Sequence, residues 1–314
     1  MKTISIISPC FNEEDNIQHC HQRVKEIFAA ELPNYQVEHI FADNASNDHS
    51  PEILRALANE NPSVKVILNA RNFGPFRSMF NALRYATGDA VIVFLPVDLQ
   101  DPPEMIPKMV KHWENGFEIV AGARTNREET LLLSTFRRLF YRITNQLSEF
   151  EIPENVGEFQ LIDRKVWQAV VNHNDQYPYV RGIIASVGFS RLIMPYTWKA
   201  RKRGVSKNNV FSLIDQAMNG IFSFTSVPLR LASFFGFGVA ALAIIYSIGS
   251  FILALITSGT APAGTHTIIV ALFFFSGVQL MFIGILGEYI TAIHAQVRRG
   301  PIVVEREKLN ITEN

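Results

Sequence analysis

Short apolar runs alternate with longer amphipathic stretches along the first 200 residues of the chain. The apolar runs are rich in β-branched residues and predict strands at 4–8, 37–42, 64–68, 90–95 and 118–121. The stretches between them predict helices at 15–29, 51–59, 76–86 and 103–115, with Ser50 and Asp101 as candidate caps. Because strands that alternate with helices usually build a parallel sheet, we expect an α/β domain with a largely parallel sheet and helices on both faces.

The pattern changes near residue 227, where the chain becomes almost wholly apolar. Residues 231–256 and 267–287 carry no charged side chain, and each run reaches the ~20 residues that a helix needs to cross a bilayer. The short segment 257–266 between them predicts an antiparallel hairpin of two transmembrane helices. A buried hairpin in a soluble protein is the alternative, which two uncharged runs of this length disfavour. Arginines flank the hairpin at Arg230, Arg298 and Arg299 but not its loop, so the positive-inside rule predicts a cytoplasmic first domain and C-terminus.

These boundaries divide the chain into four parts. We expect a cytosolic α/β domain at 1–207, a surface-lying amphipathic helix at 208–226, the transmembrane hairpin within 227–293 and a cytosolic tail at 294–314. A core-facing helix is the alternative for 208–226. Hydrophobic content of 48% with 18% charged residues excludes a disordered chain, and zero formal net charge gives no sign of a nucleic-acid partner. Cys10 and Cys20 lack a metal-ligand spacing, so we expect free thiols in a reducing compartment.

Polar side chains follow four of the predicted strands at the point where each strand ends. They are Asn12, Glu13 and Glu14 after the first, Asp43, Asn44 and Ser46 after the second, Arg71 and Asn72 after the third, and Asp98, Gln100 and Asp101 after the fourth. Turn and cap chemistry explains any one of these junctions. Four junctions at one edge of one sheet, where such folds bind ligands, predict a site instead. Oxygen ligands beside an arginine suit a divalent metal together with a diphosphate.

Three of these junctions and one later segment closely resemble family 2 glycosyltransferases of the dolichol-phosphate-mannose synthase and polyprenyl-phosphate glycosyltransferase group. The matching segments are 9–14 (Pro-Cys-Phe-Asn-Glu-Glu), 71–74 (Arg-Asn-Phe-Gly), 98–104 (Asp-Leu-Gln-Asp-Pro-Pro-Glu) and 157–164 (Gly-Glu-Phe-Gln-Leu-Ile-Asp-Arg). Segments 228–231 and 284–290 resemble the membrane signature of the two-span branch, so the resemblance runs from about residue 3 to about residue 304. It implies the GT-A fold, a Rossmann-like α/β domain, followed by a two-helix transmembrane hairpin.

The resemblance also implies roles for single residues. Pro9, Phe11, Glu13 and Asp43 would hold the nucleoside of the donor with Arg71 nearby, Asp98 and Gln100 would face Mg²⁺ or Mn²⁺, and Arg124, Arg138, Arg201 and Lys207 would meet phosphates of donor or acceptor. Glu158 and Asp98 are the expected catalytic residues. Residues 199–207 would form a basic loop that closes over the site, and a basic patch on anionic lipid is the alternative. The helical stretch 132–147, which contains Arg138, would lie along the membrane, although a solvated basic face is an equal alternative.

Several positions depart from the family pattern. Pro96 replaces the first Asp of the usual Asp-x-Asp metal motif, and Asn44-Ala45 replaces Asp-Gly in the second-strand motif. Glu158 replaces the usual Asp, Gln160 replaces an Arg, and Asn155 stands where an acid is frequent. Together these changes remove negative charge and one arginine near the sugar, and they suggest an unusual donor.

The expected reaction is transfer of a sugar from a UDP- or GDP-linked donor to undecaprenyl or dolichyl phosphate, for glycan or lipopolysaccharide modification. Because a phosphate monoester is already ionised, Glu158 is expected to organise the site rather than to remove a proton. Transfer to a hydroxyl with Glu158 as base, or a catalytically weak scaffold suggested by Pro96, are the alternatives. Expected partners are the donor, the acceptor, the bilayer of the inner membrane, further copies of the chain through the spans, and a flippase or downstream glycosyltransferase.

Overall fold

The computed structural model describes residues 1–125, 153, 155–173, 175–176, 178–197, 234–236, 238, 239, 242, 245, 265–297 and 300–311. The chain divides into two compact units, the first formed by Met1–Gln216 with Arg299–Asn314 and the second by Ala217–Arg298. The first unit is an α/β domain, as predicted. The C-terminal segment therefore belongs to the same unit as the N-terminus.

Within the described residues the first unit contains one eight-stranded sheet, in the order β7-β5-β6-β4-β1-β2-β3-β8. Its strands are β1 (Lys2–Cys10), β2 (Tyr35–Asp43), β3 (Val64–Asn69), β4 (Ala90–Ile92), β5 (Ile119–Arg124), β6 (Val156–Asp163), β7 (Arg191–Tyr196) and β8 (Glu305–Leu309). The predicted parallel core is confirmed, because β3, β2, β1 and β4 are all parallel. Strand β6 runs antiparallel to β4 and β5, and β8 runs antiparallel to β3, so the whole sheet is mixed.

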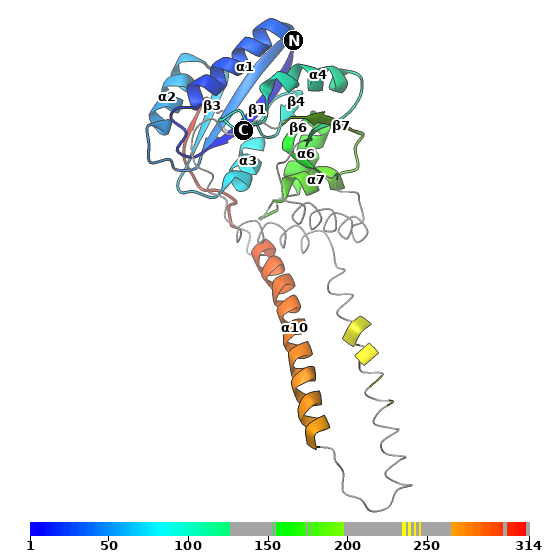
Figure 1. Cartoon of the computed structure of the whole chain (residues 1–314). Coiled ribbons are helices and arrows are strands. Elements are labelled where there is room, and N and C mark those ends of the chain that lie inside the picture. The colour runs from blue at the N-terminus through cyan, green and yellow to red at the C-terminus, as the bar shows by residue number, and fades with distance from the viewer. Residues whose placement is uncertain are drawn as a thin grey trace, which may run out of the picture. The chain divides into compact units, whose positions relative to one another are not determined.

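Helices cover both faces of this sheet, as the alternating pattern predicts (Figure 1). Helices α1 (Ile17–Glu31), α2 (Ser50–Glu60) and α4 (Ile106–Glu114) pack on one face, with the short 3-10 helix η1 (Pro103–Met105) leading into α4. Helices α3 (Pro75–Leu83), α6 (Arg164–Asn172) and α7 (Val180–Ser186) pack on the other. Strands β1, β2 and β3 are buried nearly throughout, which is typical of a sheet covered on both sides.

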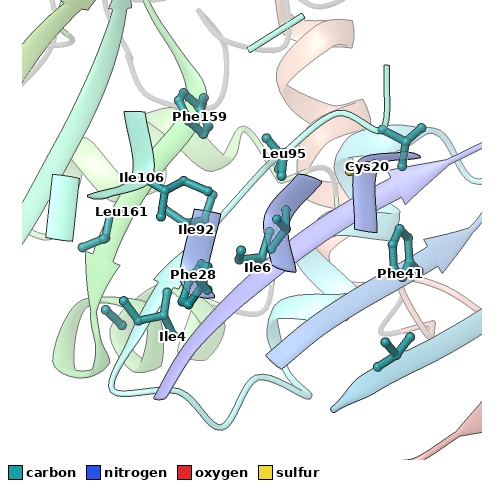
Figure 2. Close-up of a cluster of buried hydrophobic side chains, with 14 of the residues drawn as sticks. Ile4, Ile6, Cys20, Phe28, Phe41, Ile92, Leu95, Ile106, Phe159 and Leu161 are labelled. Atoms are coloured by element: carbon teal, nitrogen blue, oxygen red, sulfur yellow. The ribbon is translucent and has the colours of Figure 1, made fainter. Parts of the chain in front are cut away.

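The main hydrophobic core lies between the sheet and the helices α1, α2 and α4. Ile4 and Ile6 of β1 point into it, together with Phe28 of α1 and Phe41 of β2 (Figure 2). Ile7 is equally buried but lies outside this cluster, because successive residues of a strand point to opposite faces. The core thus fixes the register of β1 and with it the direction in which the loop after Cys10 leaves the sheet.

Two predicted helix caps are wrong. Ser50 is the first residue of α2, whose N-cap is His49, and η1 has Pro102 as its N-cap; neither cap makes a side-chain hydrogen bond. The Asp101 carboxylate instead accepts hydrogen bonds from Arg124 and Tyr196, which come from distant parts of the chain. Propensity indicates a cap at this position, but a tertiary ion pair takes the carboxylate away from the helix.

The second unit contains α10 (Thr265–Val297), which spans the predicted apolar run 267–287. Among the described residues it is the one helix long and apolar enough to cross a membrane, over Phe274–Thr291, and none of that window is buried in the protein. Most of the other predicted span, 231–256, lies outside the described residues, as do the predicted helices 132–147 and 208–226. The two-helix hairpin therefore stays a prediction.

The C-terminal segment is part of the sheet rather than a separate tail. Strand β8 pairs with β3, and Glu307 Oε2 lies 2.9 Å from Arg55 Nη2 of α2. The side-chain amide of Asn310 donates to the carbonyl oxygens of Ala58, at 2.7 Å, and Val64, at 2.8 Å. A charged strand at the sheet edge also discourages pairing with a further chain.

Candidate active site

The loops after β1 and β2 are joined by hydrogen bonds between side chains and backbone. The N–H of Asn12 donates to Ser46 Oγ at 2.8 Å, and the N–H of Glu13 donates to Ser50 Oγ at 3.0 Å. In return, Asn12 Oδ1 accepts from the N–H of Asn47 at 2.9 Å. Because β1 and β2 are parallel neighbours, both loops leave the same edge of the sheet, as predicted.

Asp43 is the buried acid of this edge. Its carboxylate accepts hydrogen bonds from the backbone N–H of Ser46, at 3.0 Å, and from the Ser46 hydroxyl. Burial raises the pKa of the Asp43 carboxyl, and the Ser46 hydrogen bonds oppose this effect. Pro9 and Cys10 end β1 beside it, and burial together with the Asp43 charge raises the pKa of the Cys10 thiol. Both cysteines are buried free thiols, so Cys10 packs as a small apolar residue.

The third loop is held to the second by Asn44, where the family usually has an acid. Asn44 Oδ1 accepts from Asn69 Nδ2 at 3.1 Å and from the N–H of Phe73 at 3.4 Å. Beyond this anchor the guanidinium of Arg71 lies over the Phe73 ring, 3.9 Å from its centroid. The predicted nucleoside-binding residues thus come from three adjacent loops that contact one another.

The fourth loop carries Asp98 and Gln100 after β4. The N–H of Gln100 donates to Asp98 Oδ1 at 3.3 Å, and the N–H of Leu99 donates to the carbonyl of Pro96 at 3.0 Å. Both side chains are partly exposed. In the described part of the chain no three His, Cys, Asp or Glu residues form a metal cluster. One carboxylate and one amide oxygen nevertheless suit Mg²⁺, which typically binds few protein ligands together with substrate phosphates.

A buried triangle joins this fourth loop to β5 and β7. Arg124 Nη2 lies 3.1 Å from both carboxylate oxygens of Asp101, and Arg124 Nε donates to Tyr196 Oη at 3.1 Å. The Tyr196 hydroxyl completes the triangle by donating to Asp101 Oδ1. Burial lowers the pKa of Arg124, but the Asp101 carboxylate and Tyr196 more than offset this, so the net shift is upward. Tyr196 has no motif signal in the sequence, and only the fold reveals its contacts.

Glu158 lies near the start of β6. Because β6 is antiparallel to β4 and β5, its start lies at the sheet edge where those two strands end. This places Glu158 at the same edge as the four loops. Glu158 Oε1 is 3.9 Å from Arg181 Nε of α7, and that Nε also donates to Tyr179 Oη at 2.7 Å. Neither Arg181 nor Tyr179 was predicted, because α7 and the residue that precedes it carry no recognisable motif.

Gln160, where the family usually has an arginine, is fully accommodated by its own strand. Its side chain is buried, and Nε2 donates to the carbonyl of Gly157 at 2.8 Å. The amide therefore braces the backbone immediately before Glu158.

Strained backbone conformations gather at the same edge. Of the five non-glycine residues with positive φ in the described chain, four lie in these loops or directly before β6: Asn12 (55°), Ala45 (60°), Leu99 (53°) and Asn155 (62°). Asn tolerates this left-handed region, whereas Ala and Leu pay a steric penalty there. Such strain often accompanies functional loops that their surroundings hold in place.

The predicted phosphate-binding residues Arg138, Arg201 and Lys207 lie outside the described residues. Arg124 is the member of this group that the structure describes, with 22% of its side chain exposed.

Comparison with known proteins identifies the family. Residues 5–171, more than half of the chain, match the family model described as glycosyl transferase family 2. The chain belongs to glycosyl transferase family 2. The GT-A-like α/β sheet that the resemblance implies is confirmed, and the four loops and the Glu158 segment described above belong to a glycosyltransferase.

Relatives of this glycosyltransferase match it over nearly its whole length. It is 36% identical to the prophage bactoprenol glucosyl transferase homolog of Escherichia coli (strain K12), over 97% of this chain and 99% of that protein. It is also 36% identical to the SfII prophage-derived bactoprenol glucosyl transferase of Shigella flexneri, over 95% and 96%. An uncharacterized glycosyltransferase of Bacillus subtilis (strain 168) is 34% identical, over 98% and 94%.

Solved structures are more distant from this glycosyltransferase. The mannosyltransferase PcManGT from Pyrobaculum calidifontis, solved with GDP-Man and Mn²⁺, shares 16% identity with a TM-score of 0.45, over 94% of this chain and 86% of that one. Likeness at this level supports no inference about donor or metal.

Proposed function

We propose that this glycosyltransferase moves a sugar from a nucleoside-diphosphate sugar onto the phosphate of a polyprenyl phosphate. The observation that carries the proposal is the match to two proteins named bactoprenol glucosyl transferases, which covers at least 95% of this chain and therefore includes its apolar C-terminal part. A lipid acceptor accounts for both parts of the chain, a nucleotide-sugar domain and a long apolar helix.

A membrane-spanning hairpin fits the connectivity of the chain. Helix α10 has 33 residues and a length of ~50 Å, enough to cross a bilayer with some tilt. Strand β7 before the apolar part and β8 after it belong to the same sheet. If α10 crosses the membrane, the chain must cross a second time between β7 and α10, and the run 231–256 is the candidate. The arginine distribution in the sequence then supports a catalytic domain on the cytoplasmic side of the inner membrane.

The donor would be held at the four-loop edge. Asp43, Glu13, Phe11 and Pro9 would enclose the nucleoside, and Arg71 would close over it by leaving the Phe73 ring. Asp98 and Gln100 would hold Mg²⁺ or Mn²⁺, which supplies positive charge against the donor diphosphate. Arg124, Arg138, Arg201 and Lys207 would meet phosphates of donor and acceptor.

The acceptor chemistry assigns an organising role to Glu158. A phosphate monoester is ionised near neutral pH, so its oxygen needs positioning by cations more than it needs a base. Arg181, which is 3.9 Å from Glu158, would help to orient that carboxylate at the reacting centre. A hydroxyl acceptor would require Glu158 to act as a general base. A nucleotide-binding scaffold is the second candidate, because Pro96 removes one carboxylate from the metal motif.

Assembly of several copies through the hairpin is part of the proposal. Gly277, Gly284 and Gly287 leave open space on α10, and small residues allow close approach of membrane helices. Cross-linking in membranes tests this assembly, and recovery of monomer alone would contradict it.

The decisive experiment is a transfer assay with the full chain, undecaprenyl phosphate and a panel of radiolabelled UDP- and GDP-sugars, with Mg²⁺ or Mn²⁺ and with chelator. Asp98→Asn serves as the matched variant. A labelled, acid-labile lipid that forms only with metal and wild-type chain supports the proposal. Metal-dependent nucleotide binding with no labelled lipid from any donor supports the scaffold instead.

A further inference from the structure

We propose that Tyr196 and Asp101 are positioning residues that hold the Arg124 guanidinium in the orientation that binds the donor diphosphate. The proposal rests on the proposed function, in which Arg124 meets a phosphate. It adds two residues that no motif marks for this role and one interaction, the Tyr196 hydroxyl with the Asp101 carboxylate.

The three side chains restrain one another from three separate segments. Asp101 closes the loop that carries Asp98 and Gln100, Arg124 ends β5, and Tyr196 ends β7. Arg124 contacts Asp101 through Nη2, at 3.1 Å from both oxygens, and Tyr196 through Nε, at 3.1 Å. With two of its nitrogens held, the planar guanidinium has one orientation. A movement of the loop that carries Asp98 and Gln100 therefore moves Arg124 as well.

Packing keeps the Tyr196 hydroxyl in this place. Tyr196 is 5% exposed, and its ring packs edge-on against Phe159 of the Gly157-Glu158-Phe159 motif, with 5.8 Å between centroids. A Cβ at Gly122 would approach Tyr196 Cε1 to 2.8 Å, so the absence of a side chain at Gly122 makes room for the ring. Because the ring cannot swing away, its hydroxyl stays directed at the triangle.

The same arrangement brings Arg124 to the reacting segment. A Cβ added at Gly157 would lie 3.8 Å from Arg124 Nη2 and 3.9 Å from Cζ, so the guanidinium packs against the backbone just before Glu158. Arg124 thus lies between the loop that carries Asp98 and Gln100 and the start of β6, where Glu158 lies.

Charge and hydrogen bonding make the three side chains of the triangle depend on one another. Asp101 is 0% exposed, and a buried carboxylate is stable only when it is paired and hydrogen-bonded. Burial and the Asp101 charge raise the pKa of the Tyr196 phenol, so it remains a hydrogen-bond donor across the working pH range. A pre-oriented arginine binds a diphosphate without first losing its own rotamer freedom.

The test is a double-mutant cycle on nucleotide binding, measured by calorimetry on the full chain. Tyr196→Phe removes the hydroxyl and keeps the ring, and Arg124→Gln removes the guanidinium. We expect Tyr196→Phe to weaken binding of UDP or GDP about 10-fold, the effect of about one good hydrogen bond, and to leave uridine or guanosine binding unchanged. In the Arg124→Gln background the same change should have no further effect.

Tyr35→Phe is the matched control. Tyr35 also donates to a carboxylate, Glu114, but it begins β2 at the opposite edge of the sheet, so nucleotide affinity should not change.

Several outcomes would overturn the proposal. A 10-fold loss that persists in the Arg124→Gln background means that Tyr196 acts independently of Arg124. An equal loss for nucleoside and diphosphate means general damage to the fold. Unchanged diphosphate affinity in Arg124→Gln would mean that Arg124 does not bind the diphosphate, so that Tyr196 and Asp101 have no positioning role. The transfer assay with the wild-type chain tests the proposed function separately. If the wild-type chain binds neither UDP nor GDP, the proposed donor is wrong and the positioning role falls with it.

Discussion

Arg181 Nε lies 3.9 Å from Glu158 Oε1, although the two residues are 23 positions apart in the chain and only Glu158 belongs to a recognisable motif. A carboxylate beside a guanidinium is held in one orientation and can fix a neighbouring group in space. This relationship favours an organising role for Glu158 and can be tested directly.

We expect Glu158→Gln to retain turnover within about 10-fold of the wild type, because the amide keeps the size of the carboxylate and one of its two acceptor oxygens. A true general base would lose about 10²–10⁴-fold. The measurement is kcat for lipid-linked sugar formation at saturating donor. Glu158→Asp, which restores the residue usual in the family, is the companion variant: full activity there with a collapse in Glu158→Gln would establish a base.

Pro96→Asp should raise the affinity of the site for the metal. It adds a carboxylate two residues before Asp98, at the position that the family uses for a ligand, and one more oxygen ligand should improve metal affinity. We expect the Mg²⁺ or Mn²⁺ concentration for half-maximal transfer to fall by about 10-fold. Pro96→Asn is the control, because asparagine is similar in size to aspartate but carries no charge. The same metal response in both variants would show that the metal does not bind at this loop.

Ala45→Gly should stabilise the protein. Ala45 has φ of 60°, where an alanine is strained and a glycine is not, and glycine is the usual family residue here. We expect the free energy of unfolding to rise by up to about 1 kcal/mol. Ala56→Gly, at an exposed position inside α2, should lower it by about 1 kcal/mol. Chemical denaturation of both variants measures these changes. A loss of stability in Ala45→Gly would contradict the claim that Ala45 is strained.

Stability should fall as the pH drops below 6.5, because of a buried histidine pair. His21 Nδ1 and His39 Nδ1 are 3.2 Å apart, and His39 Nε2 is 3.0 Å from Ser8 Oγ. Burial lowers the pKa of both side chains below 6.5, with smaller contributions from Lys25 on His21 and from His21 on His39. The unfolded chain therefore binds more protons below pH 6.5, and the free energy of unfolding decreases there.

Melting temperatures between pH 7.5 and 5.5 measure this effect. His39→Gln should flatten the pH dependence, whereas His19→Gln, at an exposed position of α1, should leave it unchanged. An unchanged slope in His39→Gln would show that the histidine pair does not cause the loss.

Removal of β8 should weaken both the fold and nucleotide binding. The N–H of Ala70, next to Arg71, donates to the carbonyl of Val304 at 2.8 Å, and Ile302 and Val303 are buried. A chain ending at Pro301 should melt about 5 °C lower or more and bind the donor nucleotide less tightly, because the Arg71 loop loses its outer anchor. Lys308→Ala removes a partly exposed ion pair with Glu305 and the contact of the ammonium with the Tyr85 ring, but it keeps the strand and should change neither quantity appreciably. Unaltered nucleotide affinity in the truncated chain would show that β8 does not support nucleotide binding.

The sequence by itself determined the class of fold and the edge of the sheet that carries the chemistry. Apolar runs of strand length revealed β1 to β5, because burial on both faces requires continuous hydrophobic residues whatever the partners are. The polar junctions after four of those strands carried enough local signal to predict a ligand site suited to a divalent metal with a diphosphate. The nucleotide-sugar chemistry came from the resemblance to family 2 glycosyltransferases, and the family match confirms that resemblance.

The tertiary structure alone decided which distant side chains meet. Asp101 is a helix cap by local rules, yet Arg124 and Tyr196 take its carboxylate, because a fully buried charge needs a paired partner more than a helix end needs a cap. Arg181 likewise reaches Glu158 from α7, and β8 pairs with β3 from the far end of the chain. Pairing between segments far apart in sequence depends on the assembled sheet and leaves no periodic or local pattern from which it could be predicted.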